Sequence, residues 1–171
     1  MKVLCINVKD KVQDYYLDLL IETIEQRPIP EFQNGNNYIF KSKYTNQLYD
    51  FFISLCKKHL NPFTINSLNF GTWCCLSDQK NNIDQWHNHK QTGTIVGVLY
   101  LKIPNSKENG IDFKLKDNEI YKTINPEPFD FLIFPNYLDH RPHGSKTNKK
   151  RISINLELKC KESAEEIFND I

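Results

Sequence analysis

The sequence predicts a mainly β protein with flanking α-helices, and two observations support this fold class. Between residues 64 and 159 the hydrophobic pattern is that of short extended segments, separated by clusters of Asn, Gly, Pro and Lys. Many short strands with turn signals between them are typical of a β-sandwich or barrel. The first 62 residues instead carry two helical patterns, and we expect these helices to cover one outer sheet.

The chain begins with an expected strand at residues 2–8, which is followed by the first helix. Asp10 and Gln13 have the spacing of a capping box, and the helix is expected to end at Arg27, before a proline. Residues 28–41 are predicted to form a loop with room for a short strand. The apolar residues of this helix recur on one face: Val12, Tyr16, Leu19, Leu20 and Ile24.

A second helix is predicted to start near Thr45 and to stop at Asn61, again before a proline. His59 lies in its last turn beside two lysines, where positive charge favours the helix dipole. We therefore expect His59 to be a helix-terminal or surface residue rather than a metal ligand. The residues that this helix is expected to bury are Leu48, Phe51, Phe52, Leu55 and Cys56.

The pattern changes from helical to extended after Thr64. Ser163 and Glu166 form a second capping box, which predicts a short C-terminal helix at residues 163–169. In the last strand Ile152, Ile154, Leu156 and Leu158 share one face, and Arg151, Ser153 and Asn155 share the other, as in a half-buried strand. The expected strands are 65–78, 84–89, 94–102, 111–115, 119–123, 129–134 and 151–159.

The length of 171 residues predicts a single domain, 1–171, because one core of this size buries roughly two thirds of the unfolded surface. Within it we expect a mostly helical support at 1–62, a β core at 63–160 and a short C-terminal helix or tail at 161–171. Nothing in the sequence predicts an oligomeric state.

Composition excludes several classes of function. A net charge of +1 with 25% charged residues gives no strong nucleic-acid signal, since such proteins usually carry a markedly basic face. No apolar run is long enough for a membrane span, and no signal peptide is evident. Five cysteines in no paired pattern suit a reducing compartment, so we expect a cytoplasmic protein.

A pair of histidines, His87 and His89, precedes an apolar strand run. If they lie on a strand, residues two apart point to the same face and present two imidazoles together. His140 follows another apolar run, 129–134, and is the expected third donor. An isolated histidine is more often a surface or core residue, but three nitrogen donors on one side of a transition metal leave positions open for substrates.

Arg151 is one of only three arginines among the 22 basic residues. Its expected place on the inner face of the last strand, beside Ser153, predicts a polar pocket wall. A guanidinium group binds a carboxylate through two parallel hydrogen bonds, whereas an ammonium group acts as a point charge. The sequence therefore predicts a carboxylate-binding role for Arg151, with Lys102 and Arg141 as the next candidates.

These motifs together resemble a known family. The order His87-x-His89, Gly97-Val-Leu-Tyr-Leu, Phe134-Pro-x-x-Leu-x-His140 and Arg151-Ile-Ser-Ile is similar to that of the Fe(II)- and 2-oxoglutarate-dependent oxygenases of the prolyl-hydroxylase-like superfamily, especially the small phage and bacterial forms. The resemblance covers roughly residues 70–158. It implies a double-stranded β-helix (jelly roll) with two N-terminal helices packed on one sheet, and the host cytoplasm if the source is viral.

The resemblance also implies roles for single residues. His87, His89 and His140 would be the iron ligands. His89 stands where the family usually has a carboxylate, so two alternatives stay open. Either three histidines coordinate the metal, or water or chloride takes the third position and only His87 and His140 bind it.

The co-substrate site follows from the same resemblance. Arg151 would pair with the far carboxylate of 2-oxoglutarate, with Ser153 and Tyr100 as helpers. The cofactors implied are Fe(II) and 2-oxoglutarate as co-substrate, with ascorbate as an additional reductant. Trp86 and Tyr137 flank the ligands and are expected to line the substrate mouth.

The function that this resemblance implies is the hydroxylation of an unidentified substrate. A peptidyl (prolyl) side chain of a peptide or protein is the first expectation, and a small molecule the second. Two alternatives come from other classes. One is a cupin-like dioxygenase with three histidines and no 2-oxoglutarate, and the other is a non-catalytic metal-binding jelly-roll domain. His143, three residues past His140, is expected to support the site or to lie at the surface.

Overall fold

The computed structural model describes residues 3–25, 37–68, 72–80, 84–105, 109–114 and 120–169. The helices within these ranges are α1 Lys9–Val12, the 3-10 helix η1 Gln13–Tyr15, α2 Tyr16–Glu25, α3 Thr45–His59 and α4 Ala164–Ile167. The strands are β1 Leu4–Asn7, β2 Asn37–Ile39, β3 Ile65–Leu68, β4 Trp73–Ser77, β5 Ile95–Lys102, β6 Ile111–Lys114, β7 Ile120–Ile124, β8 Asp130–Pro135, β9 Asp139–Pro142 and β10 Arg151–Cys160.

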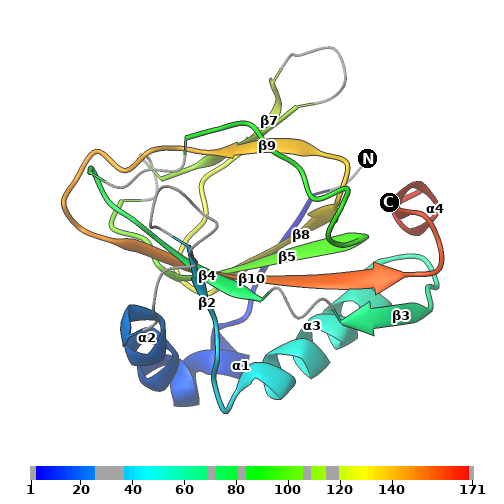
Figure 1. Ribbon diagram of the computed structural model, residues 1–171, viewed down its shortest axis with the longest axis horizontal. Coiled ribbons are helices and arrows are strands. Elements are labelled where there is room, and N and C mark those ends of the chain that lie inside the picture. The colour runs from blue at the N-terminus through cyan, green and yellow to red at the C-terminus, as the bar shows by residue number, and fades with distance from the viewer. Residues whose placement is uncertain are drawn as a thin grey trace.

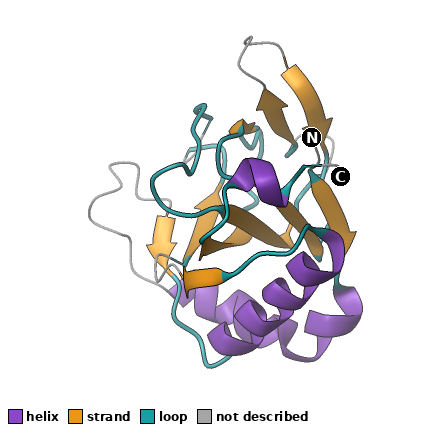
Figure 2. Ribbon diagram, turned by 90° about the vertical axis from the view of Figure 1, so that its right-hand side faces the viewer, coloured by secondary structure: helices purple, strands orange, loops and turns teal. Residues whose placement is uncertain are grey.

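These strands form two antiparallel sheets (Figure 1). The larger has the order β1-β8-β5-β10-β4-β2, and β3 also pairs with β10. The smaller has the order β7-β6-β9. Helices α1 to α3 lie against the outer face of the larger sheet in both views (Figures 1 and 2). The mainly β fold class with N-terminal helices on one sheet is therefore confirmed.

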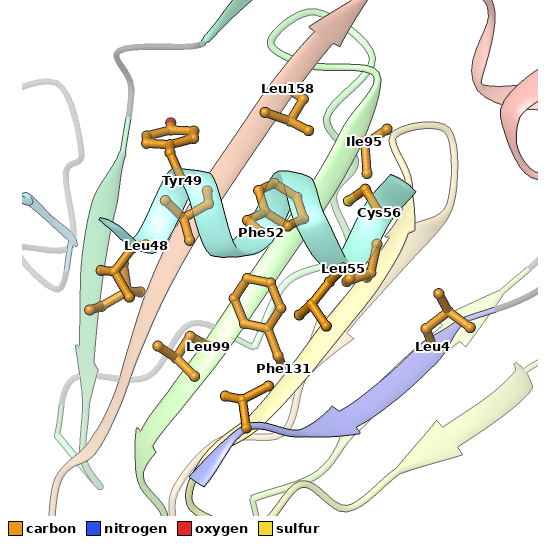
Figure 3. Packing of buried hydrophobic residues seen from close by; sticks show 14 of the residues in the cluster. Leu4, Leu48, Tyr49, Phe52, Leu55, Cys56, Ile95, Leu99, Phe131 and Leu158 are labelled. Atoms are coloured by element: carbon orange, nitrogen blue, oxygen red, sulfur yellow. The ribbon is translucent and has the colours of Figure 1, made fainter. Parts of the chain in front are cut away.

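The first hydrophobic core lies between the helices and the larger sheet (Figure 3). Helix α3 crosses the central strands and places the Phe52 ring against Phe131 of β8, with ring centroids 5.3 Å apart in an edge-to-face arrangement. Such pairs stabilise a core beyond the area they bury. Phe51 is only partly buried and Tyr49 is buried, so the apolar face of α3 is turned slightly from the expected one.

The second core lies between the two sheets. It joins Val96 and Val98 of β5 and Phe134 of β8 to Ile111 and Phe113 of β6. Because side chains alternate along a strand, β5 and β8 contribute one set of residues to the helices and the other to the space between the sheets.

Strand β10 is buried on both faces, which corrects the expectation of a half-buried strand. Ile152 and Ile154 pack toward the helices, as predicted. Arg151 and Ser153 on the opposite face are also buried, because the smaller sheet covers that side. Arg151 and Ser153 therefore form part of an enclosed polar wall, in keeping with the inward-facing polar residues expected from the sequence.

Of the two capping boxes predicted from the sequence, the structure contains one. The box at Ser163 and Glu166 is present: the Ser163 hydroxyl accepts from the Glu166 amide and the Glu166 carboxylate from the Ser163 amide. The box at Asp10 is wrong, because α1 begins after Val8 without a side-chain cap. Ile24 is also exposed rather than buried.

Strand prediction failed at two places around the histidines. Residues 84–89 form no regular strand, and only His87 makes an isolated bridge, to His140. Strand β9 was not predicted. The middle of the expected strand 65–78 and the loop before β2 fall largely outside the described residues. Among the described helices, none is long and apolar enough to cross a membrane.

Candidate metal centre

Two of the three predicted ligands are joined through their backbones. His140 lies on β9, and His87 pairs with it in an isolated antiparallel bridge. The amide of His87 donates to the carbonyl of His140 at 3.0 Å, and the amide of His140 returns the bond at 2.9 Å. The Asn88 side chain adds a hydrogen bond to Asp139 at 2.7 Å. Residues far apart in the sequence are thus fixed side by side.

The third histidine is placed by a tight turn. The amide of His89 donates to the carbonyl of Asn136 at 2.9 Å, and the carbonyl of His89 accepts from the amides of Thr92 and Gly93. Its ring stacks on Trp73 of β4, with ring centroids 5.9 Å apart. His89 is therefore held by the backbone on one side and by an aromatic ring on the other.

The three imidazoles converge. One ring nitrogen from each of His87, His89 and His140 lies within 4.8 Å of the others. The rings of His89 and His140 are nearly parallel, 5.1 Å apart, and the His87 ring is 4.1 Å from that of His140. His89 and His140 are buried, whereas His87 is partly exposed. The sequence predicted this group correctly, although the strand expected to carry the first two is absent.

The other ring nitrogens show which atoms are free. Nδ1 of His87 lies 3.0 Å from the carbonyl oxygen of Gln85, and Nδ1 of His140 lies 3.1 Å from that of Leu138. Carbonyl oxygens only accept, so each Nδ1 carries the hydrogen and each Nε2 keeps its lone pair. Such a contact is the usual way to orient a metal-binding imidazole.

The same surroundings keep two of the rings neutral. Burial lowers the pKa of His140 well below its ordinary value, and the neighbouring His87 and His89 lower it further. Burial also lowers the pKa of His87. A neutral imidazole is the form that binds a metal ion, since the protonated ring has no free lone pair.

A polar wall lies on the inner face of the larger sheet. Ser153 of β10 pairs in register with both Tyr100 of β5 and Cys75 of β4, and Arg151 pairs with Ser77 of β4. Arg151, Ser153 and Tyr100 are all buried. Burial raises the pKa of Tyr100 to about 12, an effect that the charge of Arg151 only partly offsets, so its hydroxyl stays a hydrogen-bond donor at neutral pH.

The Arg151 guanidinium has a backbone partner but no acidic one in the part of the chain that the structure describes. It donates to the carbonyl of His143 at 3.1 Å, and the ion pairs found involve other cations. Arg151 is only 3% exposed. A buried charge without a counter-ion is costly, so this position favours an anionic ligand.

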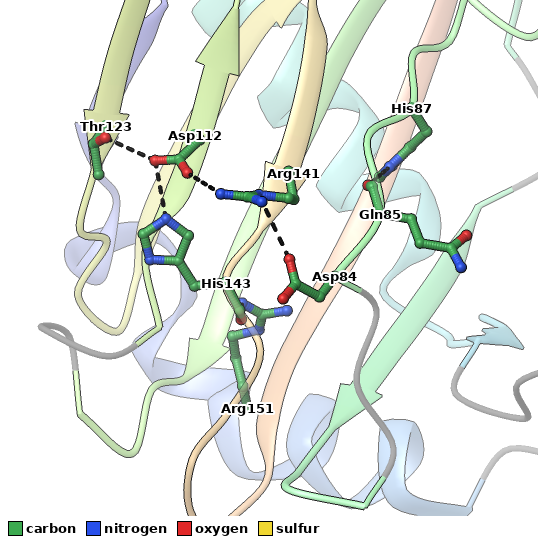
Figure 4. Close-up of polar contacts among 8 residues, drawn as sticks. All are labelled: Asp84, Gln85, His87, Asp112, Thr123, Arg141, His143 and Arg151. Carbon is green, nitrogen blue, oxygen red and sulfur yellow. Dashed lines mark hydrogen bonds and ion pairs between the residues drawn. The ribbon is translucent and has the colours of Figure 1, made fainter. Parts of the chain in front are cut away.

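Asp112 of β6 organises the polar contacts on the smaller sheet, and sequence analysis missed it (Figure 4). It accepts hydrogen bonds from Thr123 at 2.7 Å and Arg141 at 3.0 Å, and His143 Nε2 lies 2.9 Å away. Burial alone would raise the pKa of Asp112, but these contacts together hold it below its ordinary value. His143 thus supports the smaller sheet through Asp112, and its expected role beside the metal ligands stays a prediction.

The other cations and the aromatic residue considered for the site differ in their surroundings. Arg141 also lies 3.5 Å from Asp84, so it is committed to two carboxylates (Figure 4). Lys102 is exposed. Trp86 is partly buried, with the Lys114 ammonium 4.5 Å and the Arg141 guanidinium 5.0 Å from its ring centroid. Of the three cations considered for the carboxylate, Arg151 is therefore the buried one without an acidic partner among the described residues.

The chain is similar to known proteins in its fold but hardly at all in its sequence. No family model and no curated protein sequence matches the chain. Among solved structures, a viral collagen prolyl hydroxylase of Paramecium bursaria Chlorella virus 1 aligns with a TM-score of 0.64 at 12% identity, over 95% of this chain and 91% of that one. The chain has the fold of the prolyl hydroxylases.

Two further solved structures extend this result. A prolyl hydroxylase from Trichoplax adhaerens, in complex with a peptide fragment of a hypoxia-inducible factor, has a TM-score of 0.63 at 14% identity over 91% of this chain and 82% of that one. The non-haem α-ketoglutarate-dependent carbocyclase SnoK of nogalamycin biosynthesis aligns with a TM-score of 0.59 at 7% identity, over 90% of this chain and 78% of that one. The jelly-roll fold that the sequence resemblance implied is thereby confirmed.

The residues present fit a metal ion. Imidazole nitrogens suit iron, zinc, copper and nickel, and a three-sided arrangement with open positions is the one that non-haem iron oxygenases use. Two of the donor nitrogens are oriented by backbone carbonyls, the rings of His87 and His140 are kept neutral, and the three donor atoms lie within 4.8 Å of one another. This combination distinguishes the centre from a chance cluster of histidines.

Proposed function

We propose that this protein is an Fe(II)- and 2-oxoglutarate-dependent oxygenase in which His87, His89 and His140 hold the iron and Arg151 anchors the co-substrate. The observation that carries the proposal is that the histidine group and the buried Arg151 occur together on the inner side of the larger sheet. Three oriented imidazoles provide a metal site, and a buried guanidinium without an acidic partner in the described chain provides a carboxylate site.

Each feature alone has a simpler explanation. A histidine cluster also suits structural zinc, and a buried arginine can be satisfied by carbonyl groups. A 2-oxo acid uses both, because one end binds a metal while the other presents a carboxylate. Iron(II) held by these histidines would supply the redox chemistry, in which 2-oxoglutarate and dioxygen yield succinate and carbon dioxide while the substrate gains one oxygen atom.

The residues of the chain perform the binding and orienting. Arg151 would bind the far carboxylate through its planar fork, and the Tyr100 hydroxyl, which stays protonated, would donate to the same group. Ser153 offers a third donor on the same wall. The apolar residues between the sheets, including Val98 and Phe134, would exclude water from the co-substrate and strengthen these polar contacts.

A peptide is the substrate class that the proposal favours. The Trichoplax enzyme, which shares the fold, has a peptide bound. Here Trp86 lies one residue before His87 and Tyr137 three residues before His140, and both remain partly exposed, as residues at a substrate mouth would. We accordingly place a prolyl or other peptidyl side chain first and a small molecule second.

The test is the formation of succinate. The purified protein, loaded anaerobically with Fe(II) and then exposed to dioxygen with ascorbate as the reductant, should convert 2-oxoglutarate to succinate slowly even without substrate, as measured by NMR. His87→Ala should abolish this activity, and His59→Ala, at the end of α3, is the matched control that should retain it. Proline-containing peptides that gain one oxygen atom, detected by mass spectrometry, would identify the substrate class.

Other outcomes would contradict the proposal. Oxygen consumption without succinate would favour the three-histidine dioxygenase that does not use 2-oxoglutarate. Tight metal binding with neither oxygen consumption nor succinate would favour a non-catalytic metal-binding domain. Ascorbate should prolong the formation of succinate by keeping the iron reduced. It should not create this activity in a variant that lacks it.

A further inference from the structure

A glutamate lies in the interior of the larger sheet, on the face that also carries Arg151 and Ser153. Glu157 of β10 pairs in register with Val96 of β5 and is only 1% exposed. A buried carboxylate is costly unless a partner stabilises it, so its presence among apolar neighbours needs an explanation. It was not among the site residues expected from the sequence.

The partner is the unusual member of the histidine group. Oε1 of Glu157 lies 2.8 Å from Nδ1 of His89, and both side chains are buried. The two atoms lie close without the alignment of a hydrogen bond, and because a carboxylate oxygen can only accept, the contact favours the His89 tautomer with the hydrogen on Nδ1 and the lone pair on Nε2. His87 and His140 instead donate to backbone carbonyls, which are neutral. His89 alone among the three is backed by an acidic side chain.

The turn after His89 leaves room for this carboxylate. A Cβ atom at Gly93 would lie 2.8 Å from Oε2 and 3.0 Å from Cβ of Glu157, so any larger residue would push the glutamate aside. The turn is also fixed by the Asn136 side chain, which donates to the carbonyl of Gly93 at 2.6 Å. The position of Glu157 beside His89 therefore depends on the absence of a side chain at Gly93.

We propose that Glu157 is a positioning residue that supplies, through His89, the negative charge that the related oxygenases place directly on their third ligand. This inference rests on the proposed function, since it assumes that the three histidines bind the metal. A carboxylate behind an imidazole fixes the ring and makes it a stronger donor. With it, the immediate surroundings of a divalent ion carry one negative charge, as they would with an aspartate ligand.

The arrangement also bears on the two alternatives for the third ligand. A His89 that swings away would leave Glu157 buried without this contact and would lose its stacking on Trp73. Breaking a buried charged contact in this way is strongly unfavourable. Glu157 thus favours coordination by three histidines over a site completed by water or chloride.

The first test is metal affinity, measured without turnover. Anaerobic titration of the full-length protein with Fe(II), and in parallel with Co(II) followed by its visible absorption, should show Glu157→Gln binding about 10- to 100-fold more weakly than wild type. Glu127→Gln removes a carboxylate from an exposed turn and is the matched control, which should bind as wild type does. An affinity of Glu157→Gln within twofold of wild type would overturn the proposal.

A second test separates the charge of Glu157 from a role in packing. In a His89→Asp background the ligand itself is negative, and Glu157 would face it as a second buried carboxylate. Glu157→Gln should then strengthen metal binding, the reverse of its effect beside His89. A loss of affinity in both backgrounds would show that Glu157 acts through packing alone.

Two results make the failures distinguishable. If the wild-type protein binds neither metal ion, the proposed function has failed. If it binds iron and forms succinate while Glu157→Gln binds equally well, only the role of Glu157 has failed.

A third measurement decides if His89→Asp binds no metal with either residue at position 157. In the imidazole ¹⁵N spectrum of the metal-free protein, His89 should carry its hydrogen on Nδ1 in the wild type and on a mixture of both nitrogens in Glu157→Ala. An unchanged spectrum would overturn the proposal.

Discussion

His87 and His140 face each other across an isolated β-bridge, and each is the other's backbone hydrogen-bond donor and acceptor. The two imidazoles are therefore positioned by the fold before any metal binds. A site that is already assembled loses little conformational entropy on binding. Its affinity should depend mainly on the number of donor atoms that the side chains supply.

The first prediction concerns that number. His87→Ala, His89→Ala and His140→Ala should each lose iron on dialysis, because a site with two imidazoles and no other protein donor holds the ion weakly. Metal content of each variant after dialysis, measured by mass spectrometry, gives the answer, with His59→Ala as a control that keeps its metal. Retention of iron and turnover by His89→Ala, with loss of both by His87→Ala, would show that His89 is not a ligand.

This centre was predictable from the sequence in part, for a definable reason. Period-two alternation in β10 separated Ile152 and Ile154 from Arg151 and Ser153, and the structure places these sets on opposite faces. Glu157 belongs to the same alternation. The sequence does not single it out, because a glutamate on the polar face of a strand carries no signal of burial until the covering sheet and the position of His89 are known.

The failures at the histidines have a physical origin too. Residues 139–142 contain a proline and no apolar alternation, so β9 is recognisable only from its partner β6. The stretch before His89 was expected to be a strand from the spacing of its histidines, but it makes only one pairing, between His87 and His140, before the chain turns at residues 89–93. Local pattern predicts that a segment is extended, whereas pairing depends on residues far away in the sequence.

The second prediction concerns Arg151. Arg151→Ala should leave the fold and the metal in place but weaken 2-oxoglutarate binding by about 2–5 kcal/mol, the range for removing one partner of a buried charge pair. Arg151→Lys keeps the charge but loses the planar fork, so its affinity for 2-oxoglutarate should lie between that of the wild type and that of Arg151→Ala. Titration of the metal-loaded variants under anaerobic conditions measures both effects.

Lys102→Ala provides the control for this series, since Lys102 is exposed and should not affect the affinity. An unchanged affinity in Arg151→Ala would mean that another cation holds the carboxylate. In that case Lys102→Ala or Arg141→Ala should weaken binding instead.

The third prediction concerns Asp112 and pH. Asp112→Asn should lower the free energy of unfolding at neutral pH by about 1–3 kcal/mol, because the amide presents a donor to Arg141, His143 and Thr123, which themselves donate. The pKa of Asp112 is lowered in the folded state, so its contribution is present above the unfolded value of about 3.9 and is lost as the pH falls through the folded value.

Urea unfolding of wild type and Asp112→Asn at several pH values tests this sign. The difference between them should be constant near neutrality and should shrink below about pH 4. Asp14→Asn, at an exposed position on η1, is the matched control and should show little difference at any pH. A difference that grows as the pH falls would contradict the role assigned to Asp112.

The last prediction concerns the packing of α3 on β5. A Cβ atom at Gly97 would lie 2.7 Å from Cε2 of Phe52 and 3.1 Å from Cζ of Phe131, so Gly97→Ala should lower the free energy of unfolding by about 1–3 kcal/mol through overpacking. Phe52→Leu should relieve part of this, and the double variant should be more stable than the sum of the single effects implies. Because Gly97 faces the helices rather than the space between the sheets, metal affinity should be unchanged in every folded variant. Chemical unfolding gives the coupling energy, and a purely additive result would mean that the helix shifts away at no cost.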